Sequence, residues 1–182
     1  MGYYLTNQNI GKFLGSLSRM KESDRIRMKE RMGSFRTYAK ANEQMALLLA
    51  IPEEVDDATM PGAEREMVYQ NLFFVATVYC RKKVYEHVEK PIRVENLISQ
   101  ILYTNYGNPE DRMNLILEST TGQRGTLYKA LADIIRNSDE DIDCFSLMKD
   151  LQYWNTSDAR IQKKWATAFS RCRVKENTAK QE

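Results

Sequence analysis

The spacing of apolar residues, together with the positions of the prolines, restricts this sequence to a helical fold. Apolar residues recur every three or four positions throughout the chain, beginning with Ile10, Phe13 and Leu17, which share one helix face. No segment shows the sustained alternation of apolar and polar residues that a half-buried strand requires. The prolines all fall between the periodic segments, at Pro52, Pro61, Pro91 and Pro109. We therefore expect an all-α protein, a compact bundle of about eight or nine short helices.

Capping residues and prolines predict where the individual helices begin. The predicted starts lie at Ser23, Pro61, Pro91, Asn108, Asp143, and Ser157 with Asp158. A further helix is predicted from the apolar positions Phe35, Tyr38, Met45, Leu48 and Leu49. The apolar run 72–76 predicts a helix that is buried on most sides, and Trp154 and Trp165 occupy helical positions typical of a core.

The domain organisation follows from length and from the absence of a linker. A chain of 182 residues buries roughly two thirds of its unfolded surface, which is enough for one core. No internal repeat or low-complexity linker divides it. We expect one helical domain over 1–175, with an N-terminal half of about 1–90 packed against a C-terminal half of about 91–175. The polar residues 176–182 are expected to form a frayed tail.

Several functional classes lack the residues they need. His87 is the only histidine, so a multi-histidine zinc site is excluded, and no phosphate-binding glycine motif is present. Cys80, Cys144 and Cys172 lack C-x-x-C spacing and are interpreted as reduced thiols of a cytoplasmic protein. No apolar run reaches the length of a membrane span. We expect no enzyme activity, no metal or cofactor, and no membrane contact.

The net charge of +2 hides four strongly charged blocks. Residues 12–40 hold nine basic residues against three acidic ones, whereas 41–66 hold one against seven. Residues 137–150 hold one basic residue against five acidic ones, and 156–175 hold six against one. The near-neutral sum therefore excludes only a uniformly basic protein. Such a division favours one surface for phosphates and another for protein partners.

The basic blocks have helical geometry. In the predicted second helix, Arg25 with Lys29 and Arg27 with Arg31 form i, i+4 pairs. The residues of this helix expected to face the core are Ile26, Met28 and Met32. Either these pairs form the solvated side of an ordinary amphipathic helix, or they form a groove that binds a phosphate backbone without reading bases.

The last predicted helix carries a second set of basic residues. Arg160, Lys163 and Lys164 lie on one side of it, opposite its apolar residues. Aromatic side chains near other cations offer stacking surfaces for single-stranded bases. The three tyrosines in question are Tyr103, Tyr106 and Tyr128. We favour packing in the core and at its rim as their role.

The C-terminal third resembles a known family. Segment 141–154 carries the pattern D-x-x-x-L-x-x-D-L-x-x-W through Asp143, Leu147, Asp150, Leu151 and Trp154. Segment 160–169 follows with basic residues and W-A-x-x-F. Both are similar to the closing motifs of the CasB-type small subunit of the type I-E CRISPR Cascade complex. The placement of both tryptophans makes this pair of motifs the most specific part of the resemblance.

Weaker motifs extend the resemblance over about residues 10–170 in the family's order. Phe13, Leu14 and Leu17, then Met28, Lys29 and Gly33, are similar to the opening F-x-x-L and L-R-R-x-x-G patterns. Segment 74–79 looks like the central buried helix, and segments 110–112 and 127–131 match the E-R-R and L-R-R-x-L elements in part. Three family arginines are replaced here, by Glu30, Asp111 and Tyr128.

The resemblance implies a function. Members of this family are non-enzymatic helical proteins that pair as two copies in the RNA-guided complex. They contact the large subunit, the backbone subunits and each other. Their basic surface stabilises the R-loop formed with the guide RNA, chiefly by holding the displaced DNA strand.

The resemblance carries over to particular basic residues. Lys29, Arg112 and Lys129 match basic positions of the opening, E-R-R and L-R-R motifs, and Arg160, Lys163 and Lys164 lie in the closing segment. By spacing alone, Arg25, Arg27 and Arg124 are placed to compensate for the replaced arginines.

Two other functions remain open at this stage. A pure assembly scaffold would place the basic helices against acidic protein surfaces. A helix-turn-helix regulator would need sequence-dependent binding to duplex DNA, and no helix pair presents a convincing reading face.

Overall fold

The computed structural model describes residues 5–32, 47–55, 60–81, 90–121 and 126–179. The elements are α1 (Asn7–Ser18), α2 (Glu22–Glu30), the 3-10 turn η1 (Glu53–Val55), α4 (Gly62–Tyr79), α5 (Val94–Asn105), α6 (Pro109–Glu118), α7 (Thr126–Ile135), α8 (Cys144–Gln152) and α9 (Arg160–Ala179). Across these ranges no strand forms beyond an isolated parallel bridge between Ile92 and Ile142. The predicted all-α class is confirmed.

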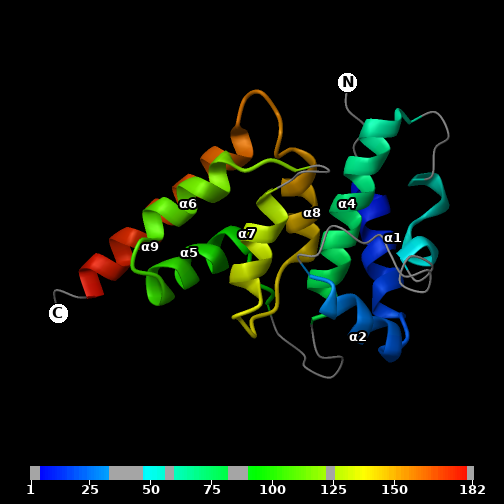
Figure 1. The fold of residues 1–182 in the computed structure, drawn as a ribbon, viewed down its shortest axis with the longest axis horizontal. Coiled ribbons are helices and arrows are strands. Elements are labelled where there is room, and N and C mark those ends of the chain that lie inside the picture. The colour runs from blue at the N-terminus through cyan, green and yellow to red at the C-terminus, as the bar shows by residue number, and fades with distance from the viewer. Residues whose placement is uncertain (1–4, 33–46, 56–59, 82–89, 122–125, 180–182) are drawn as a thin grey trace.

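Helix α4 is the centre of the N-terminal part of the fold. From Asn71 to Val78 every side chain is buried, so neighbours cover the helix on all sides. Helices α2 and α8 pack against it, and α1 completes the group (Figure 1). The burial predicted for 72–76 is confirmed.

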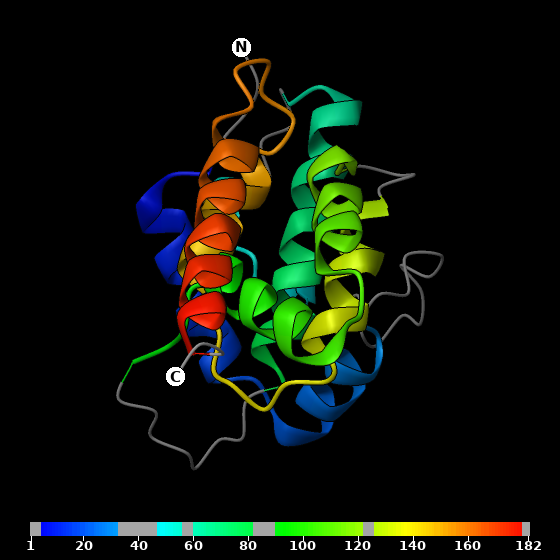
Figure 2. The same cartoon turned by 90° about the vertical axis from the view of Figure 1, so that its left-hand side faces the viewer.

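The packing order of the helices differs from their order in the chain. Helices α5, α6, α7 and α9 form a second group in which α5 packs along α9 (Figure 2). Helix α8 follows α7 in the chain but packs against α1 and α4. One continuous apolar core runs through both groups. The division of the domain into an N-terminal half and a C-terminal half near residue 90 stays a prediction. Helix α8 lies after this boundary in the chain but packs against α1 and α4, which lie before it.

The two tryptophans join α8 to α9. Trp154 and Trp165 are fully buried and meet edge to face with ring centroids 5.0 Å apart. Each indole N–H has an acceptor, Ser119 O at 2.7 Å and Asp150 Oδ2 at 2.8 Å, respectively. Their predicted core positions are confirmed.

Some predicted helix starts are confirmed. The Asp143 carboxylate accepts a hydrogen bond from Ser146 N at 2.9 Å and caps α8. Pro61 is the residue before α4, as predicted. Asp158 Oδ1 accepts a bond from Arg160 N at 3.3 Å, and α9 begins there.

The other predicted starts are confirmed or corrected as follows. Helix α6 begins at Pro109, directly after Asn108 as predicted, but the Asn108 side chain makes no capping bond. Helix α2 begins at Glu22, so Ser23 lies inside its first turn and does not cap it. Pro91 does not open α5, which begins at Val94, because Ile92 exchanges backbone hydrogen bonds with residues 141 and 143.

Other expectations fall at the edges of the described ranges. Phe35, Tyr38, Met45, Gly33 and His87 lie outside them. Leu47 and Ala50 are buried, whereas Leu48 and Leu49, two of the apolar positions from which this helix was predicted, are 49% and 78% exposed. The predicted frayed tail is wrong in part, because the helical backbone of α9 continues to Ala179.

Candidate nucleic-acid interface

Arg25 is a packing residue, contrary to its predicted place among the strand-binding cations. Its side chain is almost fully buried, and its Nη1 donates to Leu17 O at 3.4 Å. The guanidinium also lies 5.8 Å from the ring centroid of Tyr79 and 3.7 Å from the carboxylate of Glu22. The neighbouring Ile26, predicted to face the core, is 50% exposed. Arg25 is therefore buried and Ile26 exposed, which is the reverse of what the sequence predicted. Met28 and Met32 are buried as predicted.

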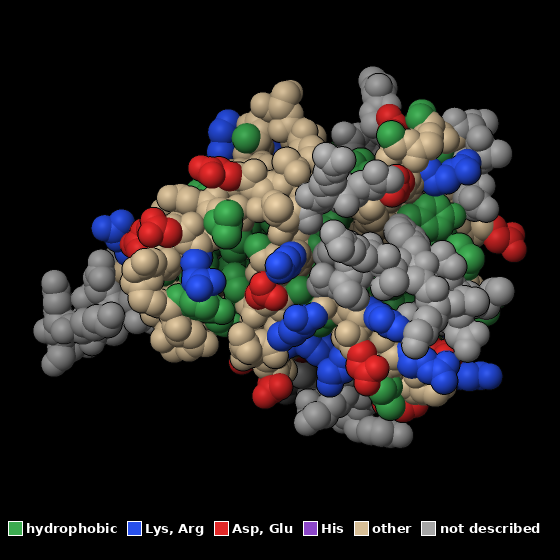
Figure 3. Space-filling model, in the orientation of Figure 1, with side chains coloured by type: hydrophobic (Ala, Val, Ile, Leu, Met, Phe, Trp, Pro, Cys, Tyr) green, Lys and Arg blue, Asp and Glu red, His purple; other side chains and the backbone are tan. Residues whose placement is uncertain are grey.

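The end of α2 lies beside the end of α7. The Arg136 side chain donates a hydrogen bond to the carbonyl of Met32, just past α2. Lys129 and Asp133 on α7 and Arg136, the residue directly after it, follow one another at i, i+4 and i+7, so they share one face, and all three are exposed. Lys and Arg side chains gather over α2 and the adjacent end of α7, with acidic groups among them (Figure 3).

We call the exposed cations of these two elements the α2–α7 surface. They are Arg27, Lys29, Lys129 and Arg136. Three of them were predicted from the sequence, and Arg136 was missed. Its spacing of seven residues from Lys129 was the available signal, because two helical turns return to the same face.

Arg81 fixes the position of the end of α7. Its guanidinium donates to the carbonyl of Ile135 at 2.7 Å and to that of Glu140. Loss of hydration at this partly buried position lowers the pKa of Arg81 from its ordinary value. The side chain remains a cation because an arginine pKa lies far above neutrality. Arg81 therefore ties α4 to the loop that follows α7.

Lys164 is held by acidic residues. Its Nζ lies 2.7 and 2.9 Å from the two carboxylate oxygens of Asp150 and 3.2 Å from Glu95 Oε1. Both carboxylates are buried, and Asp150 also accepts the Trp165 indole N–H. This network joins α9 to α8 and α5. Its charge is largely balanced, so Lys164 does not present the free ammonium that its sequence position predicted.

The other cations at the start of α9 are exposed. The Arg160 guanidinium lies 4.2 Å from the ring centroid of Tyr153, and Lys163 Nζ donates to Asp158 O at 2.9 Å. The carboxylate pKa of Asp158 is lowered, first by a hydrogen bond from Thr156 and then by the bond from Arg160 N. Arg160 and Lys163 thus sit at an ordered helix start, where both remain open to solvent.

Arg112 occupies a separate place on α6. It is exposed and lies 4.1 Å from the ring centroid of Tyr106. Tyr128 is fully buried and donates to Asn71 Oδ1 at 2.6 Å, so it cannot stack on a base. Tyr103 stacks on Phe169 at 4.7 Å. The packing role preferred for Tyr103 and Tyr128 is confirmed.

Arg124 is the remaining predicted cation, and it lies outside the described residues. The predicted set therefore divides among several places. Arg27, Lys29 and Lys129 belong to the α2–α7 surface, Arg160 and Lys163 to α9, and Arg112 to α6.

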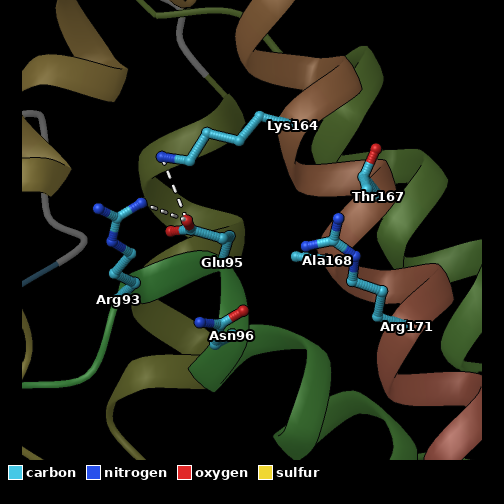
Figure 4. Close-up of a pocket in the computed structure, with 7 residues that line it drawn as sticks. All are labelled: Arg93, Glu95, Asn96, Lys164, Thr167, Ala168 and Arg171. Carbon is cyan, nitrogen blue, oxygen red and sulfur yellow. Dashed lines mark ion pairs between the residues drawn. The ribbon is translucent and has the colours of Figure 1, made fainter.

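A hollow of about 350 Å³ lies between the beginning of α5 and the middle of α9 (Figure 4). It is lined by Arg93, Glu95, Asn96, Lys164, Thr167, Ala168 and Arg171. No predicted site residue other than Lys164 lines it. The hollow could not be predicted from the sequence, because its two walls are some 70 residues apart in the chain.

The described part of the chain offers charge but no obvious reaction centre. No cluster of three potential metal ligands occurs in it. None of its helices combines the length and apolarity needed to cross a bilayer. Separate exposed cations on a helical scaffold fit binding to a polyanion by charge and shape.

Together these features define an all-helical protein with several basic surfaces. The chain matches the profile of the family described as CRISPR-associated protein Cse2 over residues 14–169, and it belongs to that family. The fold is also similar to a chain in a solved structure titled "CRISPR RNA-guided surveillance complex", with a TM-score of 0.62 and 15% identity. That match covers 97% of this chain and 99% of the other. A comparison with curated proteins gave no match.

Proposed function

We propose that this protein is a non-catalytic small subunit of a type I-E RNA-guided surveillance complex, where it holds the displaced DNA strand. The observation that carries the proposal is membership of the Cse2 family over residues 14–169. The exposed cations of the α2–α7 surface, together with those of α6 and α9, support it. The subunit acts in the cytoplasm, in keeping with the three free cysteines of the chain.

The physical task suits surfaces of this kind. Exchange of a DNA duplex for a guide RNA–DNA duplex is nearly balanced in free energy, so modest contacts to the displaced strand shift the equilibrium. Base pairing with the guide RNA selects the target, and the subunit therefore needs phosphate contacts without base readout. Exposed lysines and arginines provide these phosphate contacts. Each phosphate that they neutralise releases counterions, and this release favours binding.

The geometry narrows the set of residues proposed to contact the strand. Arg25 is excluded by its burial, and Lys164 is assigned to the network with Asp150 and Glu95. The predicted residues that remain are Arg27, Lys29, Arg112, Lys129, Arg160 and Lys163, and the structure adds Arg136 as an exposed cation. We place the strand first on the α2–α7 surface, where cations from two elements lie together (Figure 3).

The proposed partners are the other subunits of the complex. They are the large subunit, the backbone subunits and a second copy of this chain. The acidic segment 137–150 offers a surface of the opposite sign for protein contacts. No cofactor is needed for this function.

Charge reversal on the α2–α7 surface tests the proposal. The variant carries Lys29→Glu, Lys129→Glu and Arg136→Glu. We expect it to join the reconstituted complex but to leave the displaced strand accessible to a single-strand nuclease. A matched control reverses three exposed cations elsewhere, Lys90, Lys149 and Arg173, and should retain protection.

The assembly-scaffold alternative predicts a different order of losses. If the basic residues meet acidic protein surfaces, the α2–α7 variant fails to enter the complex. Full incorporation with unchanged strand protection contradicts the strand-holding function of these three residues. Size-exclusion chromatography of the reconstituted complex measures incorporation independently of the nuclease assay.

A further inference from the structure

The hollow between α5 and α9 has the features of a built binding site. One wall of the hollow is formed at the beginning of α5 by Arg93, Glu95 and Asn96. The opposite wall is formed by one side of α9, with Lys164, Thr167, Ala168 and Arg171 (Figure 4). Lys164, Ala168 and Arg171 are spaced at i, i+4 and i+7, so they line a single stripe of that helix. A volume of about 350 Å³ is within the range of small-ligand sites.

Glu95 places an acceptor in this hollow. Its side chain is 4% exposed, and its Oε1 is 3.2 Å from Lys164 Nζ and 4.0 Å from Arg93 Nη1. The other oxygen, Oε2, is buried and has no hydrogen-bond partner among the described residues. A buried carboxylate oxygen without a donor costs free energy. A ligand that donates an N–H hydrogen bond to this oxygen would therefore bind favourably at Glu95.

Two guanidinium groups flank this acceptor. Arg93 is 60% exposed and directly precedes α5, whereas the exposed Arg171 extends across the hollow from α9 (Figure 4). Arginine pairs favourably with phosphate and also stacks on flat aromatic faces. The ligand that suits the whole hollow thus carries an N–H donor edge together with an anionic group.

We propose that the hollow binds one nucleotide of single-stranded DNA and that it favours guanine. Guanine offers two adjacent N–H donors on its base-pairing edge, which suit a carboxylate with a free oxygen. Thymine has a single N–H between two carbonyl oxygens, and these would face Glu95 unfavourably. The phosphate of the same nucleotide contacts Arg93 or Arg171. This inference rests on the proposed function, because the nucleotide belongs to the displaced strand.

The hollow is separate from the α2–α7 surface. Helices α9 and α2 lie towards different ends of the molecule (Figure 1). Phosphate contacts on α2 and α7 therefore supply affinity that does not depend on base identity, while the hollow adds a preference at one nucleotide. The two contributions are separable by mutation.

Binding of four labelled oligonucleotides to the full-length protein tests this inference. Each is a 12-mer of thymidine in which the central position is dG, dA, dC or dT. At low salt we expect the dG oligonucleotide to bind about tenfold more tightly than the all-dT one, since a good polar base contact has an effect of this order. Glu95→Gln should reduce that ratio towards one.

A second pair of variants tests the hollow without changing its charges. Ala168→Leu fills the space next to Arg171 and should abolish the preference for dG. Ala166→Leu adds the same volume to α9 outside the hollow and should retain it. The triple variant of the α2–α7 surface should weaken all four oligonucleotides equally and leave the ratio unchanged.

Several outcomes overturn the inference. Equal affinity for all four oligonucleotides overturns it and leaves the proposed function intact, as does failure of the isolated protein to bind any of them while strand protection in the complex persists. If Ala168→Leu blocks incorporation into the complex but leaves the dG preference unchanged, the hollow docks a protein neighbour instead.

Discussion

Asp150 shows how much of the fold depends on one buried carboxylate. Its side chain is 6% exposed and accepts bonds from the Lys164 ammonium and the Trp165 indole. Asp150 lies on α8, whereas Lys164 and Trp165 lie on α9. A buried charge that loses its partner is strongly unfavourable, so each member of this network requires the others.

Replacing Asp150 with Ala should therefore destabilise the protein by about 3 kcal/mol, because Lys164 and the Trp165 N–H lose their shared acceptor. Chemical denaturation followed by circular dichroism measures the change. Asp139→Ala removes an exposed carboxylate from the same acidic segment and should cost less than about 0.5 kcal/mol. Equal effects of the two substitutions would contradict the role given to the network.

The cysteines differ in their surroundings. Burial raises the pKa of the Cys80 thiol to about 11 and raises that of Cys144 as well, whereas Cys172 is only partly buried. Because the thiolate is the reactive form, we expect iodoacetamide at pH 8 to modify one thiol per folded chain and three after denaturation. Mass spectrometry identifies the modified residue. Rapid modification of Cys80 in the folded protein would contradict the packing of α4.

The same pKa shift predicts a pH dependence. Unfolding returns Cys80 to its ordinary pKa of about 9, so the unfolded chain loses this proton at lower pH than the folded chain. The contribution of Cys80 to stability is complete below pH 9 and is lost as the pH rises towards 11. We expect the free energy of unfolding to fall less between pH 9 and pH 11 in Cys80→Ala than in the wild type. Denaturation of both proteins across this pH range measures the difference.

Among the elements, α8 has the clearest start signal. Asp143 accepts from Ser146 N at 2.9 Å and from Ser146 Oγ at 2.6 Å, so Asp143→Ala should lower the free energy of unfolding by about 1 kcal/mol. Asn108 precedes α6 without a capping bond, and Asn108→Ala should have little effect. Thermal unfolding of both variants checks the contrast. Equal losses in the two variants would contradict it, because Asn and Asp have similar intrinsic preferences for this position.

Local sequence predicted the long, strongly apolar elements well. The periodic residues Ile10, Phe13 and Leu17 of α1 and the apolar run 72–76 of α4 are buried, since burial of a helix face depends on spacing within the helix itself. The prediction failed on α2, where Arg25 is buried and Ile26 is exposed. An arginine becomes buried when other elements supply its acceptors, and here those are Leu17 O on α1 and the Tyr79 ring on α4. No pattern within α2 contains that information.

At the scale of the whole molecule, the candidate site depended on tertiary structure. The sequence identified most of the cations but could not show that α2 meets the end of α7, because residues 32 and 136 are far apart in the chain. The same holds for the hollow, whose acceptor on α5 is paired with Lys164 on α9. The charge blocks indicated a polyanion partner, and the fold divided the cations among α2 and α7, α6, and α9.

The salt dependence of strand protection in the assembled complex tests the central claim most directly. Protection of the displaced strand is measured over a range of salt concentrations with the wild type and with the Lys29→Glu, Lys129→Glu, Arg136→Glu variant. Three lost phosphate contacts should make the slope of log affinity against log salt shallower by about 2, at about 0.7 per contact on a single strand. An identical slope, with the variant fully incorporated, would contradict the assignment of the α2–α7 surface to the displaced strand.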